Sequence, residues 1–239
     1  MANTFFQFKQ FRVEQAGAAM KVCTDACLFG AWLPAQSATH ILDIGTGTGL
    51  LALMLAQRTS ARLTAIEIDP QAAQQAQANF LQSPWAQRLR LIAGAAQEFA
   101  RQTTEKFDWI VSNPPFFEKH WLPGDVQKAQ AKHADRRLGP EELLLLAGSL
   151  LSAEGRLALL YPPYEAARFA QMAEPKGWKP HQRLWVYNQP QKPCFRVMTV
   201  YGRENPAFPL RETELFIRDA AQQYTAEFKA LLRDFYLIF

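Results

Sequence analysis

Short apolar segments alternate with longer helix-favouring segments through the first half of the chain. The apolar segments are too short for helices, and they lack the polar alternation of a half-exposed strand. We therefore expect buried strands at 40–44, 62–68, 88–92 and 107–112, with helices at 50–57 and 70–81. Strands that alternate with helices in this way form a parallel sheet covered on both faces.

The pattern changes in the second half of the chain. We expect helices at 140–151, 165–175 and 226–236, and strands at 156–161, 182–187 and 195–201. The last two strands are joined by Asn188–Pro193, a connection too short for a crossover helix, so they should pair antiparallel. The sequence thus predicts an α/β fold with a mostly parallel seven-stranded sheet, an antiparallel edge hairpin and helices on both faces.

Composition limits the number of domains. The 239 residues are 49% hydrophobic, which is enough for one sizeable core. No repeat or low-complexity linker divides the chain, so we expect a single domain, with residues 1–35 as an N-terminal cap segment and 36–239 as its body. We expect a monomer.

Cysteine usage and hydropathy indicate the compartment. The three cysteines, Cys23, Cys27 and Cys194, form no disulfide framework, which is typical of reduced thiols in the cytoplasm. No Cys/His pair stands at a suitable spacing from Cys23 and Cys27, so we expect no metal. No segment approaches the roughly 20 apolar residues of a membrane span, and Met1–Lys9 lacks the apolar stretch of a secretory signal. We expect a cytoplasmic protein without a membrane partner.

A glycine-rich segment stands at the first strand-to-helix turn. It reads Asp43-Ile44-Gly45-Thr46-Gly47-Thr48-Gly49. Glycines at alternate positions let the backbone turn sharply and approach a ligand with no Cβ in the way. In a doubly wound sheet, the crevice beyond the strand ends takes nucleotide-like ligands. Glu67, at the end of the next strand, can hydrogen-bond a ribose diol, and Asp69 is the alternative.

The spacing of these glycines separates two classes of cofactor. Dinucleotide sites carry G-x-G-x-x-G and rest a pyrophosphate on the helix N-terminus. Here the order is G-x-G-x-G behind Asp43, which resembles the first motif of the Rossmann-like class I methyltransferases. The resemblance implies that S-adenosylmethionine is the cofactor, with Asp43 facing its amino-acid end and Glu67 contacting its ribose. The turn itself would be formed by Gly45, Thr46, Gly47 and Gly49.

One family feature is missing after the third expected strand. Many class I methyltransferases carry an acidic residue there, near the adenine ring of the cofactor. The matching residues here are Ala93-Gly94-Ala95-Ala96. We therefore expect backbone groups, or the nearby Gln97, to contact the adenine.

A second motif follows the fourth expected strand. The segment Asn113-Pro114-Pro115-Phe116 resembles the Asn-Pro-Pro-Tyr/Phe motif of amino-group methyltransferases. An exocyclic amine on an aromatic ring is a poor nucleophile because its lone pair is delocalised. The Asn113 side-chain oxygen and the Pro114 carbonyl can accept its two N–H bonds, and successive prolines hold that carbonyl rigidly. Phe116 can stack on the base.

Basic residues follow this motif. The net charge of +4 and pI of about 9.0 suit a polyanionic partner but do not require one. Five Lys and Arg side chains stand against two acids in the segment 119–137, and they are candidate phosphate contacts: Lys119, Lys128, Lys132, Arg136 and Arg137. A solvated loop would have the same composition.

The N-terminal residues carry a closer resemblance. Phe8–Phe11, Met20–Asp25 and Leu28–Trp32, together with the two motifs, look like the bacterial tRNA(Val) N6-methyltransferases that modify adenine 37. This resemblance implies tRNA as the partner, bound at its anticodon loop. It also implies that Lys21, Thr24 and Asp25 approach the cofactor. Relatives usually have Gly at the position of Cys23, and commonly Tyr at that of Phe116, where Phe keeps the stacking face.

Three other functions remain open from the residues alone. Guanine-N2 methyltransferases of rRNA often have Phe in the same motif. Glutamine-N5 methyltransferases of release factors also use Asn-Pro-Pro, but generally carry a longer helical N-terminal domain. A non-catalytic RNA-binding or S-adenosylmethionine-sensing protein would not need the intact Asn113.

Overall fold

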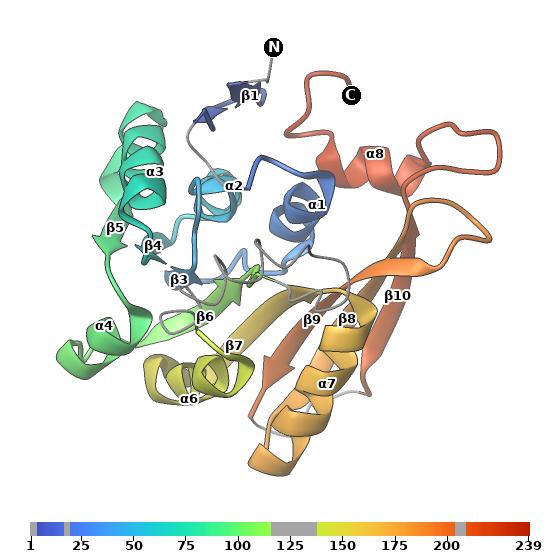
Figure 1. Ribbon diagram of the computed structural model, residues 1–239. Helices are drawn as coiled ribbons and strands as arrows, with labels where there is room; N and C mark the ends of the chain where they lie inside the picture. Colours follow the sequence, from blue (N-terminus) through green and yellow to red (C-terminus); the bar gives the residue numbers. More distant parts are fainter. Residues whose placement is uncertain (1–3, 17–19, 116–137, 204–208) are drawn as a thin grey trace, which may run out of the picture.

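The main sheet is mixed and mostly parallel. The computed structural model describes residues 4–16, 20–115, 138–203 and 209–239, and its main sheet has eight strands in that part of the chain (Figure 1). In spatial order they are β10 (Arg211–Phe216), β8 (Lys179–Tyr187), β9 (Cys194–Gly202), β7 (Leu151–Tyr161), β6 (Phe107–Ser112), β3 (His40–Ile44), β4 (Arg62–Glu67) and β5 (Leu89–Ala93). Within this sheet only β9 runs antiparallel to its neighbours, β7 and β8.

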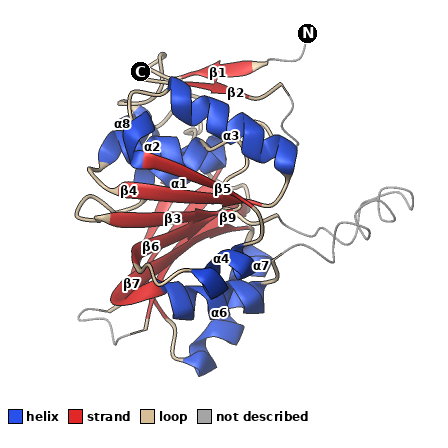
Figure 2. Ribbon diagram, turned by 90° about the vertical axis from the view of Figure 1, so that its left-hand side faces the viewer, coloured by secondary structure: helices blue, strands red, loops and turns tan. Residues whose placement is uncertain are grey.

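Helices cover both faces of the sheet (Figure 2). One face carries α1 (Thr24–Trp32), α2 (Leu50–Arg58), α3 (Pro70–Gln82) and α8 (Ala226–Leu232). The other carries α4 (Ala96–Gln102), α6 (Pro140–Leu150) and α7 (Pro163–Ala173). Short 3₁₀ turns span Ala86–Arg88 and Glu174–Lys176, and a separate hairpin pairs β1 (Phe5–Gln7) with β2 (Arg12–Glu14).

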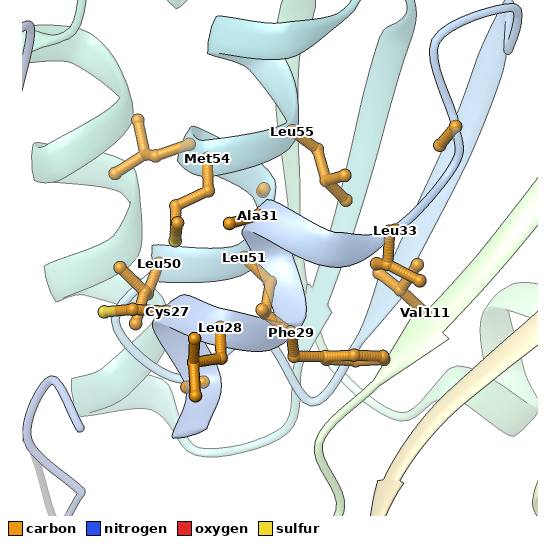
Figure 3. Close-up of a cluster of buried hydrophobic side chains, with 14 of the residues drawn as sticks. Cys27, Leu28, Phe29, Ala31, Leu33, Leu50, Leu51, Met54, Leu55 and Val111 are labelled. Atoms are coloured by element: carbon orange, nitrogen blue, oxygen red, sulfur yellow. The ribbon is translucent and has the colours of Figure 1, made fainter. Parts of the chain in front are cut away.

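Strand periodicity divides the core between the two faces. Successive side chains of a strand point to opposite faces. In β9, Met198 and Val200 therefore pack towards α1 and α8, whereas Val197 and Tyr201 pack towards α7. Figure 3 shows the first of these two cores where α1 lies against α2, with Phe29 and Leu51 among its buried side chains.

Capping residues set where helices begin. The Asp69 side chain accepts hydrogen bonds from the backbone N–H groups of Gln71 (2.8 Å) and Ala72 (2.9 Å), and Pro70 occupies the first turn of α3. In α6, the Glu142 carboxylate accepts from the backbone N–H of Gly139 at 2.9 Å. Both helices begin where the sequence predicts.

The predicted fold class is confirmed, and the sheet has one strand more than expected. The additional strand is β10, which pairs parallel to β8 outside the β8–β9 hairpin, so the hairpin is not at the edge of the sheet. Its sequence begins Arg-Glu-Thr-Glu, which lacks the apolar content of a strand. Cross-strand pairs compensate, since Arg183 bonds Glu212 at 2.7 Å and Tyr187 donates to Glu214 at 3.2 Å.

None of the described helices is both long enough and apolar enough to span a membrane.

Candidate active site

The glycine turn is fastened to the neighbouring strand. Backbone N–H groups of Gly45 and Thr46 both donate to the carbonyl of Ile66 in β4, at 2.9 and 3.1 Å. A Cβ added to Gly45 or Gly47 would meet no atom within 4 Å. The turn therefore presents bare backbone to open space at the carboxyl ends of β3 and β4, as a ligand-binding loop requires.

Asp43 is buried beneath this turn and only half satisfied. Asp43 is 1% exposed, and its Oδ2 accepts a 2.6 Å hydrogen bond from the Thr46 hydroxyl. Oδ1 is also buried and has no hydrogen-bond partner within the described residues. Burial raises the pKa of Asp43 to about 7; the Thr46 hydrogen bond opposes the shift and the charge of Glu67 adds to it. A buried acceptor of this kind suits a cationic donor from a ligand.

Glu67 holds the turn from the end of β4. Its Oε2 accepts from the backbone N–H of Gly47 at 2.8 Å, and its Oε1 accepts from the N–H of Asp69 at 2.9 Å. Each carboxylate oxygen still has a second lone pair for a ribose hydroxyl. Asp69 is exposed, and its side chain is occupied in capping α3. We therefore favour Glu67 over Asp69 as the ribose ligand.

The residues after β5 lie beside Glu67. The Gly94 N–H donates to the Glu67 carbonyl at 2.8 Å, which places the acid-free stretch Ala93–Ala96 at the same edge of the sheet. Gln97 is half-buried in α4, with its Nε2 3.5 Å from an oxygen of Glu142. The expected role of backbone groups or Gln97 at the cofactor adenine stays a prediction.

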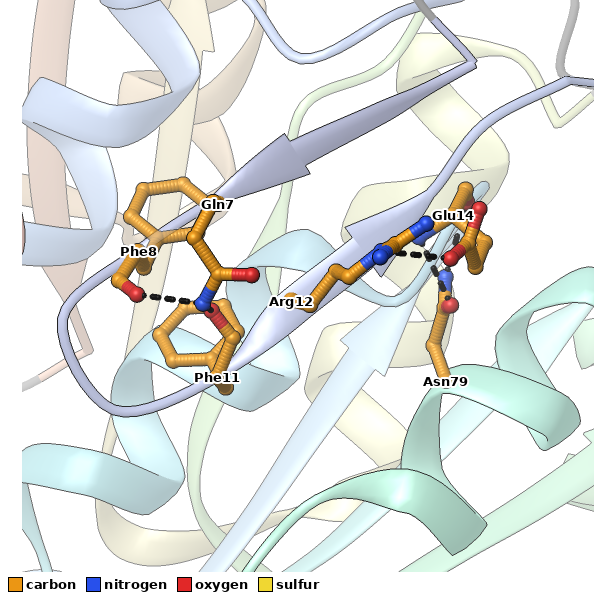
Figure 4. Close-up of polar contacts among 6 residues, drawn as sticks. All are labelled: Gln7, Phe8, Phe11, Arg12, Glu14 and Asn79. Carbon is orange, nitrogen blue, oxygen red and sulfur yellow. Dashed lines mark hydrogen bonds and ion pairs between the residues drawn. The ribbon is translucent and has the colours of Figure 1, made fainter.

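The N-terminal hairpin reaches the glycine turn through one buried amide. The Asn79 side chain of α3 donates to the carbonyls of Thr48 (2.8 Å) and Glu14 (3.0 Å), and it accepts from the Glu14 N–H (2.9 Å). Figure 4 shows this contact beside the Arg12–Glu14 ion pair. Asn79 could not be found from local sequence patterns, because the interaction joins segments far apart in the chain.

Gly49 combines a left-handed backbone with close packing. Its φ is 85°, and an added Cβ would lie 2.5 Å from Cε1 of Phe80, which is itself buried in the core. We expect Gly49→Ala to lower the free energy of unfolding by about 2–4 kcal/mol, from backbone strain and overpacking together. The matched control is Gly45→Ala, where φ is 74° but the Cβ meets nothing, so only about 1–2 kcal/mol should be lost. Urea denaturation measures both, and equal losses would contradict the packing argument.

The Asn-Pro-Pro segment lies next to the glycine turn. In the register of β3 and β6, Asp43 pairs with Val111, and the Ser112 hydroxyl donates to the Ile44 carbonyl at 2.7 Å. Asn113 follows directly, and its Oδ1 is buried without a hydrogen-bond partner in the described part of the chain. Pro114 is half-buried and Pro115 is exposed. The two predicted motifs are thus brought together at one edge of the sheet.

Some predicted residues fall outside the described ranges. They are Phe116 of the motif and the candidate phosphate contacts Lys119, Lys128, Lys132, Arg136 and Arg137.

The start of α1 is joined to β9, which lies three strands from β3 in the sheet. Lys21 and Thr24 are exposed, whereas Asp25 is buried and forms an ion pair with Arg196 of β9, 2.6 Å between Oδ2 and Nε. The pairing fastens the N-terminal segment to the sheet. Arg196 could not be found from the sequence, because nothing in its local sequence indicates a partner in α1.

The cysteines are not arranged for metal binding or thiolate chemistry. Burial raises the pKa of Cys23 and of Cys27 to about 12, so both are neutral thiols at physiological pH. Among the described residues, no cluster of His, Cys, Asp or Glu side chains could hold a metal ion.

Curated relatives match this chain along its whole length. Proteins named tRNA1(Val) (adenine(37)-N6)-methyltransferase are similar to it in Cytophaga hutchinsonii (44% identity, 99% of both chains) and Trichodesmium erythraeum (40%, 99% of both). The relative in Pectobacterium carotovorum is 41% identical, over 97% of this chain and 93% of its own.

Solved structures share the fold at much lower identity. A predicted O-methyltransferase from Agrobacterium tumefaciens aligns with a TM-score of 0.63 at 18% identity, covering 88% of this chain and 96% of that one. The TYW2 protein of Pyrococcus horikoshii, solved in complex with MeSAdo, aligns with a TM-score of 0.56 at 14% identity, covering 84% and 71%. These likenesses support the class I methyltransferase fold.

A family model agrees with both comparisons. The model described as "Methyltransferase small domain" matches residues 19–167, which include the glycine turn, Glu67 and the Asn-Pro-Pro segment. The chain therefore belongs to the methyltransferase small domain family and, within it, to the family of the tRNA1(Val) (adenine(37)-N6)-methyltransferases.

Proposed function

We propose that this protein transfers the methyl group of S-adenosylmethionine to N6 of adenine 37 in tRNA1(Val). The names of the relatives support this substrate. The structural observation that carries the proposal is Asn113, whose buried Oδ1 lies beside the glycine turn and has no hydrogen-bond partner among the described residues. A buried acceptor without a partner is costly, and a substrate N–H would satisfy it.

The residues at the strand ends fit S-adenosylmethionine. Open space above Gly45 and Gly47 leaves room for the ligand. The Oδ1 of Asp43, which has no hydrogen-bond partner in the part of the chain that the structure describes, suits the ligand's ammonium group. Glu67 suits the ribose diol, with Asp69 as the further candidate, and Lys21, Thr24 and Asp25 remain candidates on the N-terminal side. When bound, the cofactor supplies an electrophilic methyl group on a sulfonium.

The chain's own contribution to the reaction is positioning. Asn113 Oδ1 and the Pro114 carbonyl would accept the two hydrogens of the N6 amine, which turns the nitrogen lone pair out of conjugation. Pro115 restricts the backbone behind that carbonyl, and Phe116 is the proposed stacking partner of the adenine. Holding the amine in line with the methyl group supplies much of the acceleration, and no strong base is needed.

The tRNA would present its anticodon loop to this edge of the sheet. An adenine in a loop can be turned out into a pocket at lower cost than one in a duplex. Phosphate contacts from the segment 119–137 are part of the proposal, as are a monomeric enzyme and a cytoplasmic location.

Mass spectrometry of nucleosides tests the proposal. Purified enzyme is incubated with methyl-labelled S-adenosylmethionine and either tRNA1(Val) or the same transcript with guanine at position 37. We expect labelled N6-methyladenosine in the first transcript and no label in the second. Labelled N2-methylguanosine would favour the guanine-N2 alternative, and label in added release factor would favour the glutamine-N5 alternative. Label in neither RNA nor protein would favour a binding protein.

A further inference from the structure

A cavity separate from the glycine turn opens at the carboxyl ends of the parallel strands, on the same side of the sheet as Asn113. Strands β8 and β10 run parallel to each other, and β8 runs parallel to β7 through the intervening β9, so their carboxyl ends share the edge at which β6 ends. The cavity lies at these ends, beside α8, and has a volume of about 340 Å³. Its lining includes Thr24, Asp25, Asn188, Phe195, Arg218 and Tyr224. Volumes of this size accommodate small planar ligands.

A flat cationic surface forms one wall of this cavity. The Arg218 guanidinium lies 4.1 Å from the centre of the Tyr224 ring, and Tyr224 in turn stacks on Phe228 at 5.0 Å with an interplanar angle of 18°. The Arg218 Nη1 donates to the Gln222 carbonyl at 2.6 Å, which fixes the guanidinium in place. Unpaired bases stack on aromatic rings and on Arg guanidinium planes of this kind.

The charges around the cavity favour an anionic ligand. Of the described residues that line it, Asp25 is the acidic one and Arg218 the basic one. The charge of Asp25 is balanced by Arg196 at 2.6 Å, so the charge of Arg218 is left for a phosphate. The exposed side chain of Asn188 can donate to and accept from the edge of a base.

We propose that this cavity binds an unpaired nucleoside of the substrate RNA that flanks the target adenine. The inference rests on the proposed function, because it requires an RNA substrate at this edge. The cavity lies two to four strands from β6, which at about 4.8 Å per strand is about 10–20 Å from the Asn-Pro-Pro segment. An RNA loop can therefore occupy both places at once, with a few nucleotides between them.

An abasic scan of the RNA tests this assignment. Transcripts of the anticodon stem-loop are made with one abasic nucleotide at each loop position except the target. For the wild-type protein, we expect loss of one particular base to lower kcat/KM about 5- to 150-fold, mainly through KM, as for loss of a stacked base. In Arg218→Gln and in Asn188→Ala, kcat/KM for the intact loop should be lower than in the wild type. Removal of the same base should then lower kcat/KM only slightly further.

Arg62→Gln is the matched control. Arg62 is exposed at the amino end of β4, whereas the cavity lies at the carboxyl ends of the parallel strands. The variant therefore loses the same charge far from the cavity. It should keep the full abasic penalty. The inference is overturned if Arg218→Gln keeps that penalty, or if it methylates and binds RNA like the wild type, as it would if the cavity served a protein partner.

Equilibrium RNA binding separates this inference from the proposed function. If the wild type methylates no RNA but binds the stem-loop with a base-specific, Arg218-dependent loss at one abasic position, the cavity assignment holds and the catalytic proposal fails. If methylation occurs and the effect of no abasic position depends on Arg218, the catalytic proposal holds and the cavity assignment fails. If the wild type neither methylates nor binds the stem-loop, both fail.

Discussion

Asn113→Ala should bind S-adenosylmethionine with nearly wild-type affinity and transfer methyl groups at least about 10²–10³ times more slowly. Loss of a single preorganised hydrogen-bonding group at a reacting centre has effects of this size. The Asn113 oxygen is the proposed acceptor that orients the substrate amine, whereas the proposed cofactor contacts come from the ends of β3 and β4. Single-turnover kinetics with saturating cofactor measure the chemical step, and calorimetry measures cofactor binding.

The stability of this variant distinguishes a functional residue from a structural one. In the described part of the chain, Oδ1 of Asn113 is buried without a partner, so its removal takes away an unsatisfied polar atom. We therefore expect Asn113→Ala to unfold at the same or a slightly higher temperature than the wild type. Asn113→Asp keeps an acceptor oxygen and should retain more activity than the Ala variant. Full activity in Asn113→Ala, or a large loss of stability, would contradict the assignment.

The sequence predicts the parallel half of the fold well because its signals are local. Strand β3 has the expected bounds, and Asp69 followed by Pro70 marks the beginning of α3. By contrast, β10 is charged at three of its six positions and becomes a strand only because β8 offers a free edge. The seven-residue α4 was not predicted, since so short a helix depends on packing, here of Phe99 against the core.

The candidate site divides in the same way. Asp43, Glu67 and Asn113 stand directly at strand ends, and because parallel strands end at one edge, their proximity follows from the order of elements. Asn79 and Arg196 could not be found from local patterns. Each acts through a partner elsewhere in the chain, Glu14 and Asp25 respectively. Their roles depend on how distant segments pack.

Asp43→Asn should weaken S-adenosylmethionine binding about 10- to 100-fold, because a charge-assisted hydrogen bond to the ammonium is replaced by a neutral one. The same carboxyl gives the wild type a pH dependence. Its pKa is raised to about 7, so roughly half of the free protein has the ionised, binding-competent carboxylate at pH 7 and about a tenth has it at pH 6. Calorimetry should show about fivefold weaker cofactor binding at pH 6 than at pH 7, and almost no such change in Asp43→Asn.

Folding stability should respond to Asp43 in the opposite direction to cofactor binding. The folded-state pKa of about 7 lies above the ordinary carboxyl pKa of 3.8, so between these pH values the folded chain binds more protons than the unfolded chain. The contribution of Asp43 to stability is therefore complete below about pH 4 and is lost as pH rises through 7. Without cofactor, Asp43→Asn should be more stable than the wild type at pH 8. Removal of the buried charge stabilises the variant by at most about 4 kcal/mol, and the unpartnered amide hydrogens of the new side chain offset about 1–3 kcal/mol of this gain. This difference should shrink towards pH 4, and a variant less stable than the wild type at pH 8 would show that the buried carboxylate has a partner that stabilises its charge.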